Sequence, residues 1–160
     1  MSKNTDYPVT SAVRFLRTHK IDFEPYIYVY EEHGGTAQFA DLFGVDEHQV
    51  VKTIVLQNEA KKGLVVVMHG DKQISTRNLA RDLGMKHIEP ADPKQANKWT
   101  GYLVGGTTPF GMKTQLPVYV EKGIWDLEKV YINGGKRRFI IGISPQALRA
   151  LNPQDVQVAV

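Results

Sequence analysis

The stretch VVKTIVLQNEAKKGLVVVMHG, residues 50–70, decides the fold class of this chain. It holds two runs rich in β-branched residues, VVKTIVLQ and GLVVVMHG, separated by the polar, glycine-containing segment NEAKKG. Short β-branched runs bounded by turn residues are typical of strands, and a short polar connection between them favours an antiparallel hairpin. We therefore expect a β-hairpin over residues 50–70.

Further segments of the same character lie on both sides of this hairpin. They are IDFEPYIYVY (21–30), LPVYV (116–120), KVYIN (129–133), RFIIGI (138–143) and DVQVAV (155–160). The first is an aromatic strand that Pro25 interrupts early, and the last alternates like an edge strand. The sequence thus predicts strands along most of its length.

Helices are expected where a capping residue precedes an apolar period of three to four residues. The candidates are PVTSAVRFLRTHK with Thr10 as cap, TAQFADLFG with Thr36 as cap and Gly44 as stop, STRNLARDLG with Gly84 as stop, DPKQANKWTG with Asp92 as cap, and SPQALRAL with Ser144 as cap. Because helices and strands do not alternate regularly along the chain, we predict an α+β fold with a mixed, largely antiparallel sheet and flanking helices.

Length and composition indicate the number of domains and the class of protein. The chain has 160 residues, of which 42% are hydrophobic and 23% charged, so we expect a single domain spanning residues 1–160. No apolar run approaches the length of a membrane span, and the N-terminal MSKNTDYPVT lacks the apolar core of a signal peptide. We therefore expect a soluble, cytoplasmic protein without a membrane partner.

Cysteine is absent, which excludes disulfides, zinc-thiolate sites and a thiol nucleophile belonging to the protein. The formal charge is +3 and the isoelectric point is near 9.0, which mildly favours a polyanionic partner. The five histidines show no metal-ligand spacing, and HGD (69–71) is interpreted as the end of a strand. We therefore expect no metal and no cofactor. The G-x-S-x-G motif of α/β-hydrolases is also missing.

Lys52 interrupts the first apolar run and shares a strand face with Val50 and Ile54. A lysine is rarely buried without a partner, so a functional ammonium is one interpretation. The commoner interpretation is an edge-strand lysine whose stem lies on the sheet while its ammonium reaches water. Spacing alone favours the second.

Two glycine pairs are the other chemical candidates. In TGYLVGGTTPFG (100–111), Gly105 and Gly106 allow positive φ angles or close approach to a ligand, and exposed N–H groups there can hold an oxyanion or phosphate. In YINGGKRRF (131–139), the glycines precede Lys136, Arg137 and Arg138. That segment is either a hairpin turn with a solvated basic tip or the frame of a pocket whose mouth takes a phosphate chain. The first pair is equally compatible with a plain tight turn.

The order of these segments along the chain identifies a protein family more specifically than any single segment does. VVKTIVL, VVVMHGDKQIS, NLARDLG, HIEPADPKQANKWTGYLVGGTTPFG, LPVYVE and VYINGGKRR with IGISPQAL together resemble the YbaK family of aminoacyl-tRNA deacylases, relatives of the editing domain of bacterial prolyl-tRNA synthetases. The resemblance runs from about Val9 to Leu151 and implies a mixed fold around a curved sheet.

The resemblance also implies site residues. Lys52 matches the functional lysine of the family, Thr53 the polar residue beside it, and Gly105 to Pro109 the G-x-x-x-P loop. The implied catalytic residues are Lys52 and Gly105. The implied substrate-binding residues are Tyr28 or Tyr30, Thr53, Gly106, Thr107, Thr108, Pro109, Asn133 and Gly134. Asn133 stands where the family often has serine, and Gly142 where some relatives have an acidic residue.

The implied activity is hydrolysis of the ester of mischarged tRNA, with Cys-tRNA(Pro) or Ala-tRNA(Pro) as substrate and prolyl-tRNA synthetase as a recruiting partner. The loop would supply N–H groups to the carbonyl oxyanion, and Lys52 would align the substrate. Without a protein thiol or metal, the nucleophile is either a water or the thiol of a mischarged cysteine. Two rival functions are a non-catalytic tRNA- or synthetase-binding module and, more weakly, a DNA-binding regulator.

Overall fold

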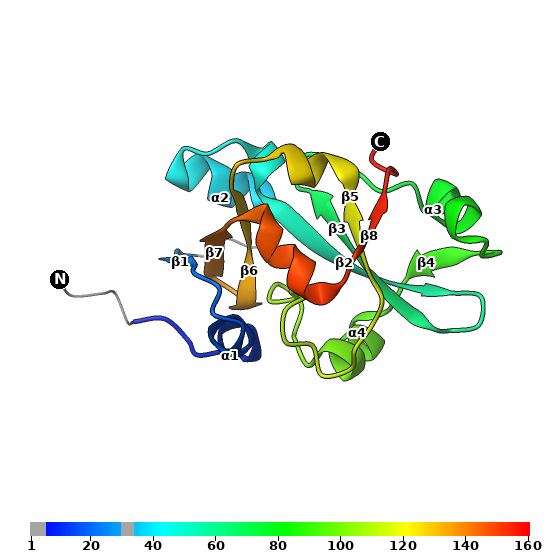
Figure 1. The fold of residues 1–160 in the computed structure, drawn as a ribbon, viewed down its shortest axis with the longest axis horizontal. Helices are drawn as coiled ribbons and strands as arrows, with labels where there is room; N and C mark the ends of the chain where they lie inside the picture. The colour runs from blue at the N-terminus through cyan, green and yellow to red at the C-terminus, as the bar shows by residue number, and fades with distance from the viewer. Residues whose placement is uncertain (1–5, 30–33) are drawn as a thin grey trace.

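The computed structural model describes residues 6–29 and 34–160 (Figure 1). Its strands form two sheets. The three-stranded sheet has the order β1-β7-β6 and the five-stranded sheet the order β4-β2-β3-β5-β8. The strands are β1 (Glu24–Ile27), β2 (Val51–Asn58), β3 (Gly63–His69), β4 (Ile88–Pro90), β5 (Val118–Glu121), β6 (Val130–Lys136), β7 (Phe139–Ile143) and β8 (Gln154–Val156).

The predicted hairpin over residues 50–70 is confirmed. β2 and β3 pair antiparallel in a register that runs from Val51 opposite His69 to Gln57 opposite Gly63. Every residue of β3 after Gly63 is buried, because β3 lies between β2 and β5 in the sheet and helices cover both faces. β5 pairs with both β3 and β8 in parallel, whereas the other strand pairs are antiparallel. The expected mixed, largely antiparallel arrangement is therefore confirmed, divided between two sheets.

A parallel bridge between Val50 and Tyr131 links the two sheets. It lies immediately before β2, so the start of β2 stands beside β6. β4 pairs with β2 only from Leu56 to Asn58. The first half of β2 is therefore open on the side that faces β6, and this edge is where the pocket described below lies.

Four α-helices lie within the described residues: α1 (Ser11–Thr18), α2 (Gly35–Phe43), α3 (Thr76–Leu83) and α4 (Pro93–Thr100). The described residues also form the 3₁₀ helices η1 (Glu47–Gln49), η2 (Lys122–Asp126) and η3 (Pro145–Leu151). The caps at Thr10 and Asp92 and the left-handed stops at Gly44 and Gly84 are confirmed. No described helix has the length and apolar composition needed to cross a membrane.

Two local expectations were wrong. Thr36 does not cap α2, because the helix already begins at Gly35 and the Thr36 hydroxyl instead donates to the Glu47 carboxylate. The strand expected over residues 21–30 is shorter, since β1 ends at Ile27 and Tyr28 lies beyond it. β1 is an edge strand, which is where a strand tolerates Pro25.

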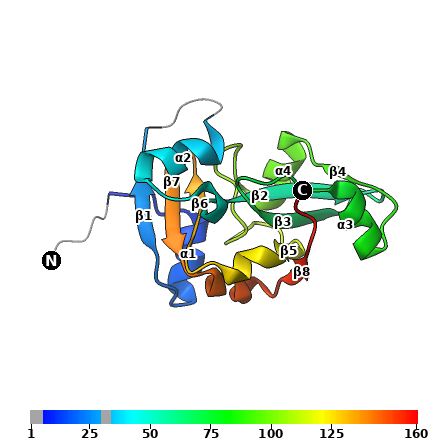
Figure 2. The same ribbon diagram turned by 90° about the horizontal axis from the view of Figure 1, so that it is seen from above.

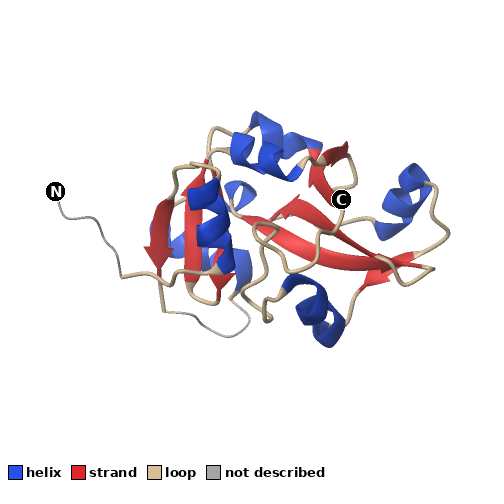
Figure 3. Cartoon of the chain, turned by 60° about the horizontal axis from the view of Figure 1, so that its bottom comes forward, coloured by secondary structure: helices blue, strands red, loops and turns tan. Residues whose placement is uncertain are grey.

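The three-stranded sheet is buried between α1 and α2 (Figure 1). Phe139 and Ile141 pack with Leu16 of α1, while Ile140 packs with Phe39 of α2. Alternate residues of β7 thus face opposite helices, as a strand with apolar residues on both faces requires. α3 and α4 cover the five-stranded sheet in the same way, since Leu79 and Trp99 belong to different apolar clusters (Figures 2 and 3).

Candidate active site

A pocket of about 450 Å³ lies along the open edge of β2, between α2, the start of α4, the loop after α4 and strand β6. Residues from segments far apart in the sequence line it. Of the residues expected from sequence, the pocket brings together Tyr28, Lys52, Thr53, Gly105, Thr107 and Asn133. Tyr30 lies outside the described residues. Gly106, Thr108, Pro109 and Gly134 do not line the pocket but shape the segments that do.

The backbone of Thr53 faces this pocket. The Val55 carbonyl accepts a hydrogen bond from the Ala91 N–H at 3.1 Å, so Val55 turns its backbone groups away from β3. In an antiparallel pair, residues two apart direct their N–H and C=O groups to the same edge. The N–H and C=O of Thr53 therefore point to the open edge of β2. The Thr53 hydroxyl is buried there and has no hydrogen-bond partner among the described residues.

Lys52 is partly buried at the same edge. Its ammonium donates to the Gly70 carbonyl at 3.5 Å, so it meets a protein acceptor. Burial lowers the pKa of Lys52 below its usual range, and the negative charges of Glu47 and Asp71 oppose this shift. The pKa of this ammonium is thus set by two opposed effects: burial, which lowers it, and two nearby carboxylates, which raise it.

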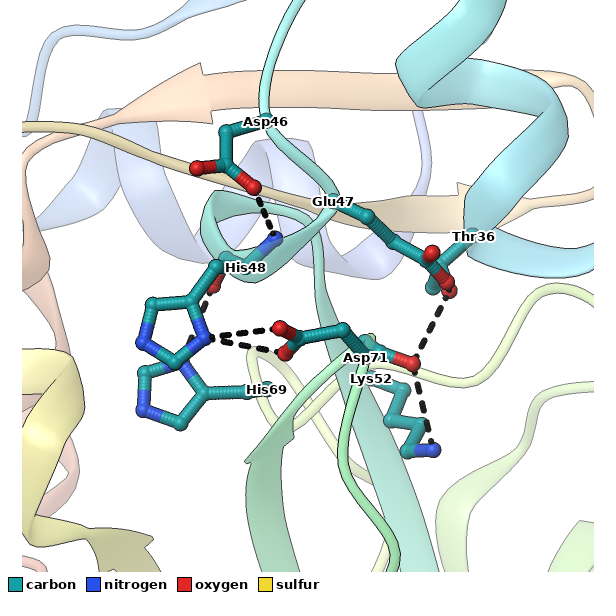
Figure 4. A network of polar contacts seen from close by, with 8 residues as sticks. Thr36, Asp46, Glu47, His48, Lys52, His69 and Asp71 are labelled. Carbon is teal, nitrogen blue, oxygen red and sulfur yellow. Dashed lines mark hydrogen bonds and ion pairs between the residues drawn. The ribbon is translucent and has the colours of Figure 1, made fainter.

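Three residues that sequence reasoning did not single out for the site hold Lys52 in place (Figure 4). The Thr36 hydroxyl lies 2.7 Å from a Glu47 carboxylate oxygen and 3.3 Å from the Gly70 carbonyl oxygen that also accepts from Lys52. A side chain at Gly70 would not fit, since its Cβ would lie 2.3 Å from the Val50 carbonyl oxygen. No motif marks this network, because its members come from α2, η1 and the end of β3.

The opposite side of the pocket is formed by the loop over residues 101–111. Gly105 has a φ of +89°, which favours glycine, and the Gly106 N–H donates to the Leu103 carbonyl at 2.9 Å. The Gly106 N–H is therefore occupied by a turn. The N–H groups of Gly105 and Thr107 have no acceptor within the described part of the chain, and both residues line the pocket.

Asn133 of β6 fixes this loop. Its amide nitrogen donates to the Gly105 carbonyl at 2.7 Å, and its amide oxygen accepts from the N–H groups of Gly135 and Lys136 at 2.7 and 3.1 Å. The two glycine pairs seen in the sequence are thus joined by one side chain. Gly106 packs on the backbone of Lys136, where a Cβ would lie 3.0 Å from the Lys136 Cα.

The far end of the loop is anchored in the core. The Tyr102 hydroxyl donates to the Phe110 carbonyl at 2.5 Å, and burial raises the pKa of Tyr102 to about 12. Thr108 is fully buried and its hydroxyl has no partner among the described residues. Pro109 faces a different, smaller hollow beside Phe15. These residues therefore set the path of the loop.

A second polar cluster, formed by His48, His69 and Asp71, lies beside Lys52 (Figure 4). The His48 Nδ1 is 2.9 Å from an Asp71 carboxylate oxygen, and the His48 and His69 rings stack at 3.7 Å. The His69 Nδ1 is 2.9 Å from the His48 carbonyl oxygen. These three side chains could together hold a metal ion. The spacing along the sequence did not reveal the group, because the pairing of β2 with β3 places His48 beside His69 and Asp71, which lie 21 and 23 residues further along the chain.

Gly142 lies apart from this pocket. It lines a shallow hollow of about 620 Å³ on the three-stranded sheet, with Gln49, Glu128 and Lys129 among its other lining residues. Lys129 there forms an ion pair with Glu24. The larger hollow thus lacks Lys52 and the glycine loop, so we place the candidate chemistry in the smaller pocket.

The chain is similar to known proteins of one family. The profile of a family described as the aminoacyl-tRNA editing domain matches residues 31–151. EbsC of Enterococcus faecalis, named as a candidate Cys-tRNA(Pro)/Cys-tRNA(Cys) deacylase, is 28% identical over 152 residues, covering 94% of this chain and 93% of EbsC. A proline–tRNA ligase of Brachyspira hyodysenteriae is 27% identical over 94 residues, covering 59% of this chain and 16% of the ligase.

A solved structure of similar description shares the fold. A solved structure described as a candidate trans-editing enzyme for prolyl-tRNA synthetase superposes with a TM-score of 0.81 at 23% identity, covering 94% of this chain and 97% of that one. The profile match spans β2, the glycine loop and the turn after β6, which are the segments that build the pocket. The chain belongs to the aminoacyl-tRNA editing domain family.

Proposed function

We propose that this protein hydrolyses the ester bond of mischarged aminoacyl-tRNA, with Cys-tRNA(Pro) or Ala-tRNA(Pro) as substrate, in the cytoplasm where translation takes place. One observation carries the proposal: Lys52, Gly105 and Thr107 line the same pocket of about 450 Å³, and the N–H groups of the two loop residues have no acceptor among the described residues. A cation and free backbone donors in one concave site suit an ester whose carbonyl oxygen becomes negative during hydrolysis. The names of EbsC and of the prolyl-tRNA synthetase relatives support the choice of substrate.

In this proposal the nucleophile comes from outside the protein, which has no cysteine thiol of its own. In the first route, a water oxygen bonds to the ester carbon, the bond from that carbon to the ribose oxygen breaks, and the water proton ends on the ribose oxygen. Gly105 and Thr107 would donate to the carbonyl oxygen, where one donor typically lowers the barrier by about 2.7–4 kcal/mol. Lys52 would hold the substrate by its terminal phosphate or ribose, which aligns the ester with the attacking water.

In the second route, the sulfur of a mischarged cysteine bonds to its own ester carbon, the bond from that carbon to the ribose oxygen breaks, and the thiol proton passes to the ribose oxygen. The cyclic thioester that leaves is then opened by water to free cysteine. Alanine has no thiol, so it can leave only by the first route. Release of alanine therefore requires the first route, whereas release of cysteine is compatible with both. The pocket itself discriminates weakly, since one methylene is worth about 1–3 kcal/mol.

The test is release of amino acid from tRNA(Pro) charged separately with Cys, Ala and Pro, with the wild-type protein and its Lys52→Ala variant. We expect lysine-dependent release of Cys or Ala and little release of Pro. Circular dichroism of the variant checks that it folds. Unimpaired release by Lys52→Ala would refute the role of the lysine, and no release from any of the three, even with prolyl-tRNA synthetase present, would favour a binding module.

The second candidate function is a non-catalytic module that binds tRNA or a synthetase, and the hydrogen bonds of Asn133 favour it. The family often has a serine at this position, whereas here the amide binds the backbone of residues 105, 135 and 136. A side chain used in this way offers no hydroxyl to a substrate. Tight binding of tRNA or of prolyl-tRNA synthetase without hydrolysis would support this second function.

A further inference from the structure

The turn between β6 and β7 carries three consecutive cations, Lys136, Arg137 and Arg138, all exposed. Within the part of the chain that the structure describes, neither Lys136 nor Arg138 forms a salt bridge. Arg138 has a φ of +75°, a conformation that residues other than glycine rarely adopt. Lys136 and Arg138 therefore display positive charge that no carboxylate among the described residues pairs with.

This basic turn stands at the rim of the pocket. The Arg137 guanidinium donates to the Val104 carbonyl at 3.4 Å, and Asn133, which lies in β6 before the turn, donates to the Gly105 carbonyl. Val104, Gly105 and Asn133 all line the pocket. A chain that leaves the pocket over this rim would therefore pass the cations.

The rim is also apolar in one place. Leu103 is 75% exposed and Val104 is 62% exposed, although both are large aliphatic side chains. They lie in the loop against which the basic turn packs. Cations beside an exposed apolar pair match a single-stranded nucleic acid, which presents phosphates along its backbone and flat base faces between them.

We propose that Lys136 and Arg138, together with Leu103 and Val104, form the docking surface for the single-stranded 3′ end of the tRNA. The cations contact backbone phosphates of the nucleotides that precede the terminal adenosine. The apolar pair packs against a base face. The assignment rests on the proposed function only in placing the esterified end of the strand in the pocket.

Binding of uncharged RNA tests this separately from hydrolysis. The probe is an acceptor-stem minihelix ending in a single-stranded CCA, and the measurement is its affinity across a salt series. Each phosphate contact to single-stranded RNA contributes about 0.7 to the slope of log K against log salt concentration. The double variant Lys136→Gln, Arg138→Gln should therefore lower the magnitude of the slope by about 1.4 and weaken binding at low salt.

The matched control is Lys62→Gln with Arg77→Gln, which removes one exposed lysine and one exposed arginine from the β2–β3 turn and from α3. These elements lie at the end of the molecule away from β6 (Figure 1). We expect the control to keep the wild-type slope. Leu103→Ala should weaken binding without changing the slope, because an apolar contact releases no counterions.

A second RNA probe shows whether the single-stranded end is what the surface binds. A minihelix that lacks the three single-stranded nucleotides should bind the wild type and the double variant equally. An equal loss of affinity for both minihelices, or an unchanged slope in the double variant, would overturn the assignment. Retained RNA binding with loss of binding to prolyl-tRNA synthetase would also overturn it, since the surface would then dock a protein. Failure of the proposed function alone would appear as the expected difference in slope between the wild type and the double variant, together with no ester hydrolysis.

Discussion

Lys52 and Gly105 line one pocket from two walls that are held in different ways. The strand wall is the first half of β2, which pairs with β3 along its length. The loop wall is the segment over residues 101–111, whose path depends on side chains that bind its backbone: Asn133 at one end and Tyr102 at the other. The strand wall is thus fixed by pairing and burial, whereas the loop wall is fixed by a few hydrogen bonds.

The difference separates two kinds of mutational effect. On the strand wall, a substitution near Lys52 changes the charge around its ammonium while β2 stays in place. On the loop wall, the loss of one anchoring side chain moves the N–H groups of Gly105 and Thr107, although neither residue is altered. Catalysis is sensitive to such movement, since a misplacement of about 1 Å can cost about a hundredfold in rate.

The largest effect is expected for Asn133→Ala. The change removes three hydrogen bonds to the backbone of residues 105, 135 and 136, so we expect a loss of about 1–3 kcal/mol in the free energy of unfolding. We also expect kcat/KM for deacylation to fall by about a hundredfold. Urea denaturation and single-substrate kinetics measure the two quantities.

Asn133→Asp separates the two consequences. Its carboxylate can still accept from the N–H groups of Gly135 and Lys136 but cannot donate to the Gly105 carbonyl. We expect most of the stability to return while the activity stays low. Wild-type activity in either variant would show that the loop wall does not depend on this anchor.

The sequence predicted the strand wall better than the loop wall. The β-branched runs of residues 50–70 are a local signal, and the hairpin that they build follows from them directly. Lys52 stood out because it interrupts such a run. The loop wall depends instead on contacts between segments far apart in the sequence, such as Asn133 with Gly105, 28 positions away, which no local pattern encodes.

The same reasoning explains the misassigned cap at Thr36. A threonine before an apolar period is a frequent helix cap, but the Glu47 carboxylate, which follows α2 in the chain, lies 2.7 Å from its hydroxyl. The glycine pairs were recognised in the sequence, yet only the fold brings Gly106 against Lys136. Family resemblance supplied Lys52 and the loop, and it could not supply Glu47 or Gly70.

The next effect is a shift in pH dependence, expected for Glu47→Gln on the strand wall. The Glu47 charge raises the pKa of Lys52 against the effect of burial, so its removal lowers that pKa further. The ammonium is then lost at a lower pH, and the alkaline limb of the kcat/KM profile moves to lower pH. Glutamine can still accept from the Thr36 hydroxyl, which keeps the local geometry.

Asp82→Asn is the control for this profile, since it removes an exposed carboxylate from α3. We expect its alkaline limb to coincide with that of the wild type. An unmoved limb in Glu47→Gln would show that the charge of Lys52 does not govern the rate in this pH range.

The smallest effects compare two buried threonines, one on each wall. The hydroxyls of Thr53 and Thr108 are both buried without a partner among the described residues, but only Thr53 lines the pocket. Burying a polar group without a hydrogen bond is unfavourable, so valine, which has nearly the same shape, should stabilise either position by about 1 kcal/mol. Thr108→Val should gain this stability with no change in kcat/KM.

Thr53→Val should gain similar stability but lose activity, because a hydroxyl left unpaired at a pocket wall is free to bind the substrate. The open N–H and C=O of Thr53 at the same edge are unaffected by this change, so the loss isolates the side chain. Urea midpoints and kcat/KM for the two variants make the comparison. Equal activity in both would assign the Thr53 hydroxyl to packing alone and leave Lys52 as the functional side chain of the strand wall.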